Sequence, residues 1–242
     1  EKRLSGNKLA ISGDFNIITG QSAAIKNIKN CVHLAELEIN DLIPEPVASS
    51  FSVLSDDDKE KGVILMDIGA GTTNIAVYYK NILRHLAVIP YGCIFITSAL
   101  KHGINISTEQ AENLKMRFGS VVEKHAPEIN SVRIPNISGG ETFEISFRTI
   151  ASIIQSALGE IIDSVLFEIK NSGLYEKIGN GIVLTGGGAL FEDINVLINE
   201  KTNLNVRLGQ PCEPLNITNF DELNNPIYSS SIGLLKCHLS DS

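Results

Sequence analysis

The chain has 242 residues, of which 43% are hydrophobic and 20% are charged, and its formal net charge at pH 7 is −8. This length and apolar fraction fit one large or two small globular domains and exclude a disordered chain. Nucleic-acid binders draw affinity from clustered Lys and Arg, and the sequence has no such cluster, so we expect no nucleic-acid partner.

The four cysteines, Cys31, Cys93, Cys212 and Cys237, are far apart and include no Cys-x-x-Cys pair. We predict buried free thiols in a reducing compartment, in preference to a disulfide or a metal site. The sequence contains no run of 18 apolar residues, so we expect no membrane-spanning helix. The first residues lack a signal-peptide core and an initiator Met, so we expect the chain to be part of a longer protein.

The first fifty residues predict a sheet edge followed by two helices. Residues 4–20 alternate weakly, as in one or two strands. Residues 21–37 have apolar positions at helical spacing, and residues 38–43 are predicted to be a short strand. Pro44 and Pro46 flank Glu45 at the start of the second helix, because proline suits the first helical turn. Glu45 is either an acid favoured by the helix dipole or a functional carboxylate.

Residues 55–61, with the sequence SDDDKEK, are predicted to form a solvated acidic turn at a hinge or subdomain boundary. An EF-hand loop would alternate its acids, include a glycine and end in Glu. The three consecutive aspartates therefore do not indicate a calcium site.

A glycine-rich hairpin follows at residues 62–79. Its first strand ends at Asp67, and Gly69 and Gly71 frame a tight turn before Thr72 and Thr73. Glycine lets backbone N–H groups approach an anion, and the two hydroxyls add donors. Asp67 can hold a hydrated divalent cation beside phosphates. An ordinary glycine-rich β-turn remains the alternative for the glycines alone.

Two helices are predicted after a third strand at residues 82–90. The first helix covers residues 93–101, and the second covers residues 107–118 behind a capping box at its start. Glu112 and Lys115 share one face of the second helix. As an isolated pair they would form a surface salt bridge of little energetic value.

A hairpin and a long helix come next. Residues 132–137 and 142–147 are predicted to pair about two glycines. Residues 150–169 show the strongest helical period in the chain. A membrane-surface helix is the alternative, but the polar face of this helix carries acids and no basic residue, which favours a core helix.

A second apolar strand, residues 181–185, runs into Gly186, Gly187 and Gly188, and a helix is predicted over residues 190–201. The N-terminus of a helix beside a glycine turn favours an anion or a nucleotide. A strand at residues 203–208 and a helix at residues 228–239, which contains Gly233, complete the predicted elements.

These motifs resemble the actin-like ATPase superfamily and, within it, the FtsA family of bacterial cell-division proteins. The matching segments are residues 66–78 (MDIGAGTTNIAVY), 83–85 (LRH), 88–90 (VIP) and 181–187 (GIVLTGG). The resemblance covers nearly the whole chain. It implies an α/β fold with an actin-like, ribonuclease H-like mixed sheet flanked by helices and a small α+β subdomain inserted in the second lobe.

The same resemblance implies a division of the chain into three parts. Residues 1–20 would be the tail of an FtsA-specific extra subdomain, and residues 21–60 would be the second half of the first core subdomain. Residues 61–242 would be the second lobe, with a large core at 61–102 and 148–242 and a small subdomain at about 103–147.

The resemblance also implies roles for particular residues. Residues 67–73 would form the second phosphate loop, and Glu45 would orient the attacking water and the hydrated Mg²⁺. The implied catalytic residues are Glu45 and Asp67, with Asp67 holding the metal through water. The implied ATP-binding residues are Gly69, Gly71, Thr72, Thr73, Glu112, Lys115, Gly186, Gly187, Gly188 and Gly233, with Glu112 and Lys115 beside the ribose and adenine.

For the whole protein, the resemblance implies ATP and Mg²⁺ binding, polymerisation into protofilaments and tethering of FtsZ, whose C-terminal tail would dock on residues 103–147. The location would be the cytoplasmic face of the bacterial inner membrane at the division septum. The family's first phosphate loop and its C-terminal membrane helix have no counterpart here, so this chain is expected to bind ATP weakly and to be inactive. The intact protein is expected to be at most a slow ATPase. The alternatives are a small-molecule kinase of the sugar kinase/actin superfamily and a chaperone-type ATPase.

Overall fold

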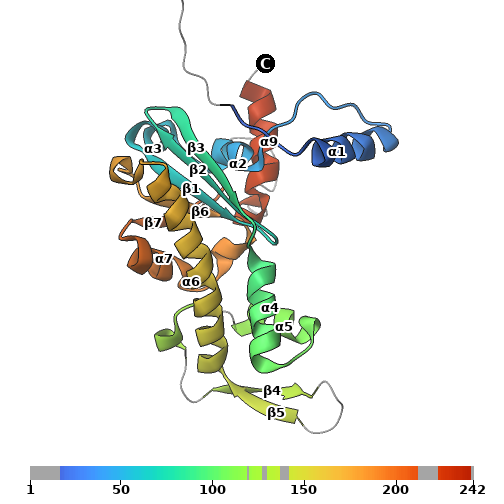
Figure 1. Ribbon diagram of the computed structural model, residues 1–242, viewed down its shortest axis with the longest axis vertical. Coiled ribbons are helices and arrows are strands. Elements are labelled where there is room, and N and C mark those ends of the chain that lie inside the picture. The colour runs from blue at the N-terminus through green and yellow to red at the C-terminus, as the bar shows by residue number, and fades with distance from the viewer. Residues whose placement is uncertain (1–16, 119, 127–129, 137–141, 212–222, 241–242) are drawn as a thin grey trace, which may run out of the picture. The chain divides into compact units, whose positions relative to one another are not determined.

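The computed structural model describes residues 17–240 except 119, 127–129, 137–141 and 212–222 (Figure 1). The chain divides into two compact units, residues 1–41 and 42–242. In the first unit, helix α1 (Ser22–Leu34) confirms the helix predicted at 21–37. The strands predicted within residues 4–20 lie mostly outside the described residues.

Two predictions are wrong, a short strand near the start of the chain and the burial of the cysteines. Residues 38–43 form no strand, because a short segment with a few apolar residues makes a strand only where it pairs with a partner strand. Cys31 is exposed on α1, and Cys93 and Cys237 are only partly buried, although Cys31 and Cys93 are free thiols as predicted. Apolar neighbours in a helical sequence lie on other faces of the helix and do not bury the residue between them. Cys212 lies outside the described residues.

The larger unit is built on a five-stranded sheet with the order β3-β2-β1-β6-β7. Its strands are β1 (Val63–Ile68), β2 (Thr73–Tyr79), β3 (Ile82–Ile89), β6 (Ile182–Thr185) and β7 (Val206–Leu208). The first three pair antiparallel as consecutive hairpins, while β6 and β7 run parallel to β1 after long crossovers. The predicted mixed sheet is confirmed.

Helices cover both faces of this sheet, and all six residues of β1 are therefore buried. Alternate side chains of β1 point to opposite faces. One set, with Ile64 and Met66, packs in the core with α6 (Phe147–Asn171). The other set, with Val63 and Leu65, packs with α2 (Glu45–Val53). Helix α9 (Ser229–Ser240) packs against α2 (Figure 1).

Helix α6 is the core helix that the sequence predicted at residues 150–169. Ten of its residues are buried, among them Ile154, Leu158 and Ile161. Among the described residues it is also the one helix long and apolar enough to cross a membrane by length and composition alone. Half of that apolar stretch is buried within the protein, as in the core helix of a folded domain.

The remaining predicted elements form close to their expected bounds. Helices α4 (Cys93–Ile104) and α5 (Thr108–Phe118) follow the sheet hairpins. The capping box is present, because the Gln110 N–H donates to Ser107 Oγ at 3.1 Å and the Ser107 N–H donates to Gln110 Oε1 at 2.8 Å. Strands β4 (Ser131–Pro135) and β5 (Thr142–Ser146) form the predicted antiparallel hairpin.

The helix predicted at residues 190–201 is split in two. A 3₁₀ turn, η3 (Gly187–Leu190), follows the glycines, and α7 (Ile194–Thr202) begins only after Asp193. Asp193 has a φ of 63°, which lies outside the helical region and interrupts the helix. Three further 3₁₀ turns are η1 (Glu123–His125), η2 (Tyr175–Lys177) and η4 (Pro226–Tyr228).

The acidic segment predicted to be a solvated turn is a short helix, α3 (Asp56–Lys61). Ser55 and Asp58 form a capping box, and Asp58 is 6% exposed. The Asp58 carboxylate accepts hydrogen bonds from the Ser55 N–H at 2.9 Å and from Arg207 Nη2 at 2.6 Å. The prediction failed because the capping box starts a helix at these aspartates, and because Arg207, from a strand distant in the sequence, pairs with Asp58.

We expect the free energy of unfolding of Asp58→Asn to fall less than that of the unaltered chain as pH is lowered. Burial alone would raise the pKa of Asp58, but hydrogen bonds from Ser55 and the Arg207 charge outweigh burial and leave the pKa below its usual value. The stability this carboxylate contributes is therefore full above about pH 4 and is lost as pH falls through its folded pKa. Urea unfolding between pH 3 and 7 measures the effect. Asp56→Asn, which removes an exposed charge from the same helical turn, is the control and should leave the pH dependence nearly unchanged.

Candidate functional site

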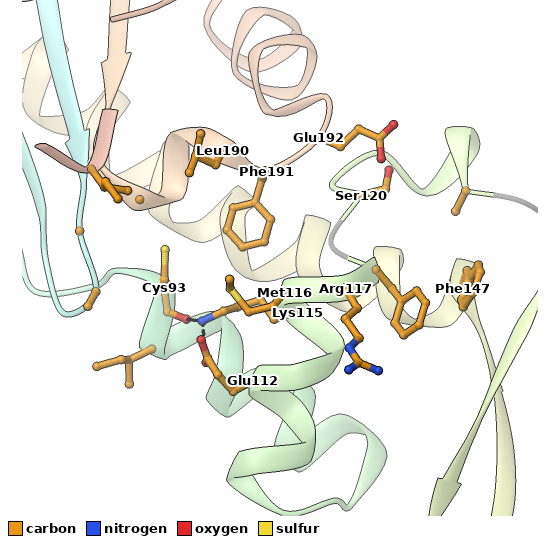
Figure 2. A pocket seen from close by; sticks show the side chains of 17 residues that line it. Cys93, Glu112, Lys115, Met116, Arg117, Ser120, Phe147, Leu190, Phe191 and Glu192 are labelled. Carbon is orange, nitrogen blue, oxygen red and sulfur yellow. Dashed lines mark hydrogen bonds and ion pairs between the residues drawn. The ribbon is translucent and has the colours of Figure 1, made fainter. Parts of the chain in front are cut away.

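A cavity of about 760 Å³ lies where the two glycine-rich turns meet (Figure 2). Gly69 from the β1–β2 turn and Gly187 from the turn after β6 both line it, together with Glu112 and Lys115 of α5. Because β1 and β6 are parallel neighbours, their carboxyl ends lie at the same edge of the sheet. The sheet topology therefore brings together two turns that are far apart in the sequence.

The turn after β6 requires glycine at its first position. Gly186 has a φ of 83°, a backbone conformation that other residues rarely adopt. A Cβ at Gly186 would also overlap Asp67 Oδ1 and lie 2.6 Å from the Ile68 carbonyl oxygen. The backbone of this turn thus packs directly on the carboxylate at the end of β1.

The β1–β2 turn is held by the start of α4. The Gly69 N–H closes the turn by donating to the Thr72 carbonyl at 2.9 Å. The Cys93 N–H donates to the Gly69 carbonyl at 3.0 Å, and the Ile94 N–H donates to the Ala70 carbonyl at 2.8 Å. The first N–H groups of α4 are thus satisfied by this turn. Gly92, just before α4, packs closely on the turn, because a Cβ there would lie 2.6 Å from the Gly69 carbonyl oxygen.

Two carboxylates that do not line the cavity, Glu45 and Asp67, share a hydrogen-bonded network. Asp67 is 3% exposed, and Ser49 Oγ donates to its Oδ2 at 2.7 Å. Ser230 Oγ lies 2.8 Å from Ser49 Oγ and 3.4 Å from Glu45 Oε1. Asn74 Nδ2 donates to Glu45 Oε2 at 2.9 Å. The network thus joins α2, β1, β2 and α9 around the two acids.

Burial raises the pKa of Asp67 above its ordinary value. The hydrogen bond from Ser49 acts in the opposite direction, the nearby Glu45 raises the pKa further, and Ser230 again lowers it. A buried carboxylate of this kind gains from a bound cation that offsets its charge.

The oxygens of the Asp67 carboxylate are ligands of the kind that Mg²⁺ prefers. The described residues contain no group of three or more His, Cys, Asp or Glu side chains that could enclose a metal ion. Mg²⁺ commonly keeps several of its waters and binds one or two carboxylates together with phosphate oxygens. A single buried carboxylate is compatible with the contact through water that the resemblance implies for Asp67, and this contact stays a prediction.

Asp67→Asn is expected to make the protein more stable at pH 7. The pKa of Asp67 is higher in the folded protein than in the unfolded chain, where it is about 4. Ionisation of Asp67 therefore lowers the free energy of unfolding as pH rises from about 4 to the folded pKa. A neutral Asn avoids this loss and can still accept the hydrogen bond from Ser49. Urea midpoints at pH 7 and pH 3.5 should show a gain only at the higher pH. Asp163→Asn, in an exposed ion pair with Lys201, is the surface control and should show no gain.

Glu112 and Lys115 form part of a second network at the cavity wall. Lys115 Nζ donates to Glu112 Oε2 at 2.7 Å and to Thr97 Oγ1 at 2.9 Å. Thr97 Oγ1 in turn donates to Glu112 Oε2 at 2.7 Å. Partial burial raises the pKa of Glu112, but these hydrogen bonds and the Lys115 charge outweigh it and leave the pKa below its ordinary value. The pair predicted to be a plain surface salt bridge in isolation is anchored to α4.

The other predicted site residues lie outside the cavity lining. Thr73 is fully buried, and its hydroxyl donates to the Tyr91 carbonyl at 2.8 Å. Gly188 packs on Ile68, where a Cβ would overlap the side chain. Gly71 and Thr72 lie in the β1–β2 turn, and Gly233 packs against α2.

Four residues that the sequence analysis did not assign to the site are Ser49, Asn74, Thr97 and Ser230. Ser49 follows Glu45 by four residues, and this helical spacing was a usable signal. Asn74 stands inside the matched motif at residues 66–78. The sequence offers no local signal for Thr97 or Ser230, because their partners come from other elements of the fold.

Comparison with known proteins gives the family. The family model described as "Cell division protein FtsA" matches residues 64–233. The chain is 36% identical over 232 residues to the cell division protein FtsA of Pseudomonas aeruginosa, an alignment that covers 96% of this chain and 55% of that protein. It is 34% identical over 242 residues to the Escherichia coli K12 protein of the same name, which covers 95% of this chain and 57% of that protein. The chain spans about half the length of the curated relatives it matches.

A solved structure shows the fold. The crystal structure of MreB 5 of Spiroplasma citri bound to AMPPNP matches with a TM-score of 0.73 and 20% sequence identity, covering 92% of this chain and 68% of that chain. The actin-like fold class predicted from the sequence is confirmed. Since the family model matches residues 64–233, which are well over half of this chain, the chain belongs to the FtsA family of cell division proteins.

Proposed function

We propose that the whole protein binds ATP with Mg²⁺ between two lobes, assembles into actin-like protofilaments and tethers FtsZ to the inner membrane at the division septum. Membership of the FtsA family supports the role in cell division. The single observation that most supports nucleotide binding is that Gly69 and Gly187 line one cavity together with Glu112 and Lys115. Its volume of about 760 Å³ lies in the range usual for small-molecule sites.

The residues of this site would divide the nucleotide between them. The turn at residues 69–72 would lie against the phosphates, and the turn at residues 186–188 would lie against the adenosine. Glu112 would face the ribose, and the apolar side chains of Met116 and Phe191, which also line the cavity, suit a purine ring.

The two acids would serve hydrolysis. Asp67 would hold Mg²⁺ through water, and the ion would supply positive charge to the phosphates. Glu45 would orient the attacking water, and Asn74 and Ser230 hold the Glu45 carboxylate in place for this task.

We further propose that the three sequence-derived parts, residues 1–20, 21–60 and 61–242, correspond to the subdomains of the family. In this proposal the C-terminal tail of FtsZ docks on residues 103–147. Attachment to the cytoplasmic face of the inner membrane uses the family's C-terminal amphipathic helix.

Titration calorimetry of this chain with ATP, with and without Mg²⁺, tests the site. Weak binding is the expectation that the family resemblance gives for this chain. Glu112→Ala should weaken binding further. Glu109→Ala, which removes a glutamate of the same helix that does not line the cavity, should bind ATP as the unaltered chain does. Tight Mg²⁺-dependent binding would contradict the expected weakness, and no binding at millimolar ATP would contradict the site.

A further inference from the structure

One wall of the cavity is fixed by side chains whose hydrogen bonds are used inside the protein. This wall is the contact between α4 and α5, and the inference drawn from it rests on the proposed nucleotide site. Figure 2 shows Lys115 and Glu112 of α5 meeting Cys93 at the start of α4.

Lys115 has no donor left over for a ligand. An ammonium group has three N–H donors. Those of Lys115 are directed at Glu112 Oε2 at 2.7 Å, Thr97 Oγ1 at 2.9 Å and the Cys93 carbonyl at 3.4 Å. Lys115 is also only 7% exposed. It therefore acts through its neighbours in the protein.

Thr97 supplies the second bond that fixes Glu112. Thr97 is 3% exposed, and its hydroxyl oxygen lies 2.7 Å from Glu112 Oε2 and 3.1 Å from the Cys93 carbonyl. A hydroxyl has one hydrogen to donate, and the shorter contact is to the charged carboxylate, so we place the proton there. Glu112 Oε2 thus receives two donors, one from α4 and one from α5.

This geometry leaves the other carboxylate oxygen for a ligand. Among the hydrogen bonds of the described residues, those to Glu112 go to Oε2, and the Glu112 side chain remains 48% exposed at the cavity. An ionised carboxylate oxygen is an acceptor only, and it suits the hydroxyl groups of a ribose.

We infer that Thr97 is a positioning residue for ribose recognition: with Lys115 it holds the Glu112 carboxylate so that Oε1 accepts from a ribose hydroxyl of the bound nucleotide. The same helix start also holds the turn at the phosphate end, because the Cys93 N–H donates to the Gly69 carbonyl at 3.0 Å. Helix α4 thereby sets the distance between the ribose contact and the phosphate turn.

The test compares ATP with 2′-deoxyATP and 3′-deoxyATP on the full chain by NMR titration, which also measures millimolar dissociation constants. The unaltered chain should prefer ATP to at least one deoxy form by about 10-fold, the value of one hydrogen bond to a charged group. Thr97→Val removes the hydroxyl but keeps the shape, and it should lose most of this preference. Thr97→Ser keeps the hydroxyl and should retain the preference. Thr97→Ala serves in place of Val if the valine disturbs folding.

A double variant separates positioning from a general structural effect. If Thr97 acts through Glu112, then Thr97→Val combined with Glu112→Ala should show the same ratio of affinities as Glu112→Ala alone. The inference is overturned if Thr97→Val keeps the full preference, if the double variant loses more than Glu112→Ala, or if the unaltered chain binds ATP and both deoxy forms equally. Failure of the unaltered chain to bind ATP at all would instead remove the proposed function, and this inference with it.

Discussion

Glu45→Ala is expected to slow ATP hydrolysis by the whole protein about 100-fold while leaving ATP affinity almost unchanged. Glu45 lies outside the cavity lining, so its removal takes no contact from the nucleotide base or ribose. Its carboxylate is fixed from two sides, by Asn74 Nδ2 at 2.9 Å and by Ser230 Oγ at 3.4 Å. A group held in this way is suited to orient a water molecule, and an alanine leaves that water without a fixed acceptor.

Glu45→Gln separates the two roles that this carboxylate can have. If Glu45 orients water, the amide oxygen of Gln continues to accept, and hydrolysis should stay within about 10-fold of the unaltered rate. If Glu45 takes the proton from water, Gln should be as slow as Ala. Single-turnover hydrolysis and a separate binding titration give the two quantities. An unaltered rate in Glu45→Ala would remove Glu45 from the mechanism.

Elements whose sequences carry a complete local signal could be predicted. The strands at residues 63–68 and 73–79 are marked by apolar runs on both sides of a glycine turn, and α6 is marked by its helical period. The meeting of the two glycine turns was expected from the family resemblance, which added the sheet topology that local patterns lack.

The features that were missed depend on partners far away in the sequence. The aspartates of α3 look solvated until Arg207 is placed against Asp58. Thr97 is an unremarkable helical residue until α5 brings Glu112 and Lys115 beside it. In the same way, nothing adjacent to Ser230 in the sequence indicates that it bridges Glu45 and Ser49. Such contacts follow from tertiary packing, which periodicity and spacing do not specify.

The site also lowers the stability of the protein at one point. Asp67 is buried at the end of the central strand with a raised pKa, and its ionisation disfavours the folded state. A hydrophobic residue or an amide at this position would lower the free energy of unfolding less than a buried charge does. The proposed function would give this charge a use, because a Mg²⁺ ion held through water would offset it.

Gly233→Ala should destabilise the protein by about 2 kcal/mol, even though Ala is the better helix former by about 1 kcal/mol. Gly233 lies inside α9 where this helix crosses α2, and a Cβ there would overlap the Ala48 carbonyl oxygen and lie 3.2 Å from the Ser49 nitrogen. The obstacle is backbone, which cannot turn aside as a flexible side chain can. Helix α9 must therefore move away from α2, and the loss of packing exceeds the gain in helix propensity.

Gly159→Ala is the matched control, because Gly159 is also a buried glycine inside a helix. A Cβ there would meet only the flexible end of Lys201, with the nearest atom at 3.3 Å. Urea unfolding should show Gly159→Ala to be neutral or stabilising and Gly233→Ala to be destabilising. Since α2 carries Glu45 and Ser49, a shift of α9 should also slow hydrolysis in Gly233→Ala. Equal effects of the two substitutions on stability would show that helix propensity, and not the contact with Ala48, decides the outcome at Gly233.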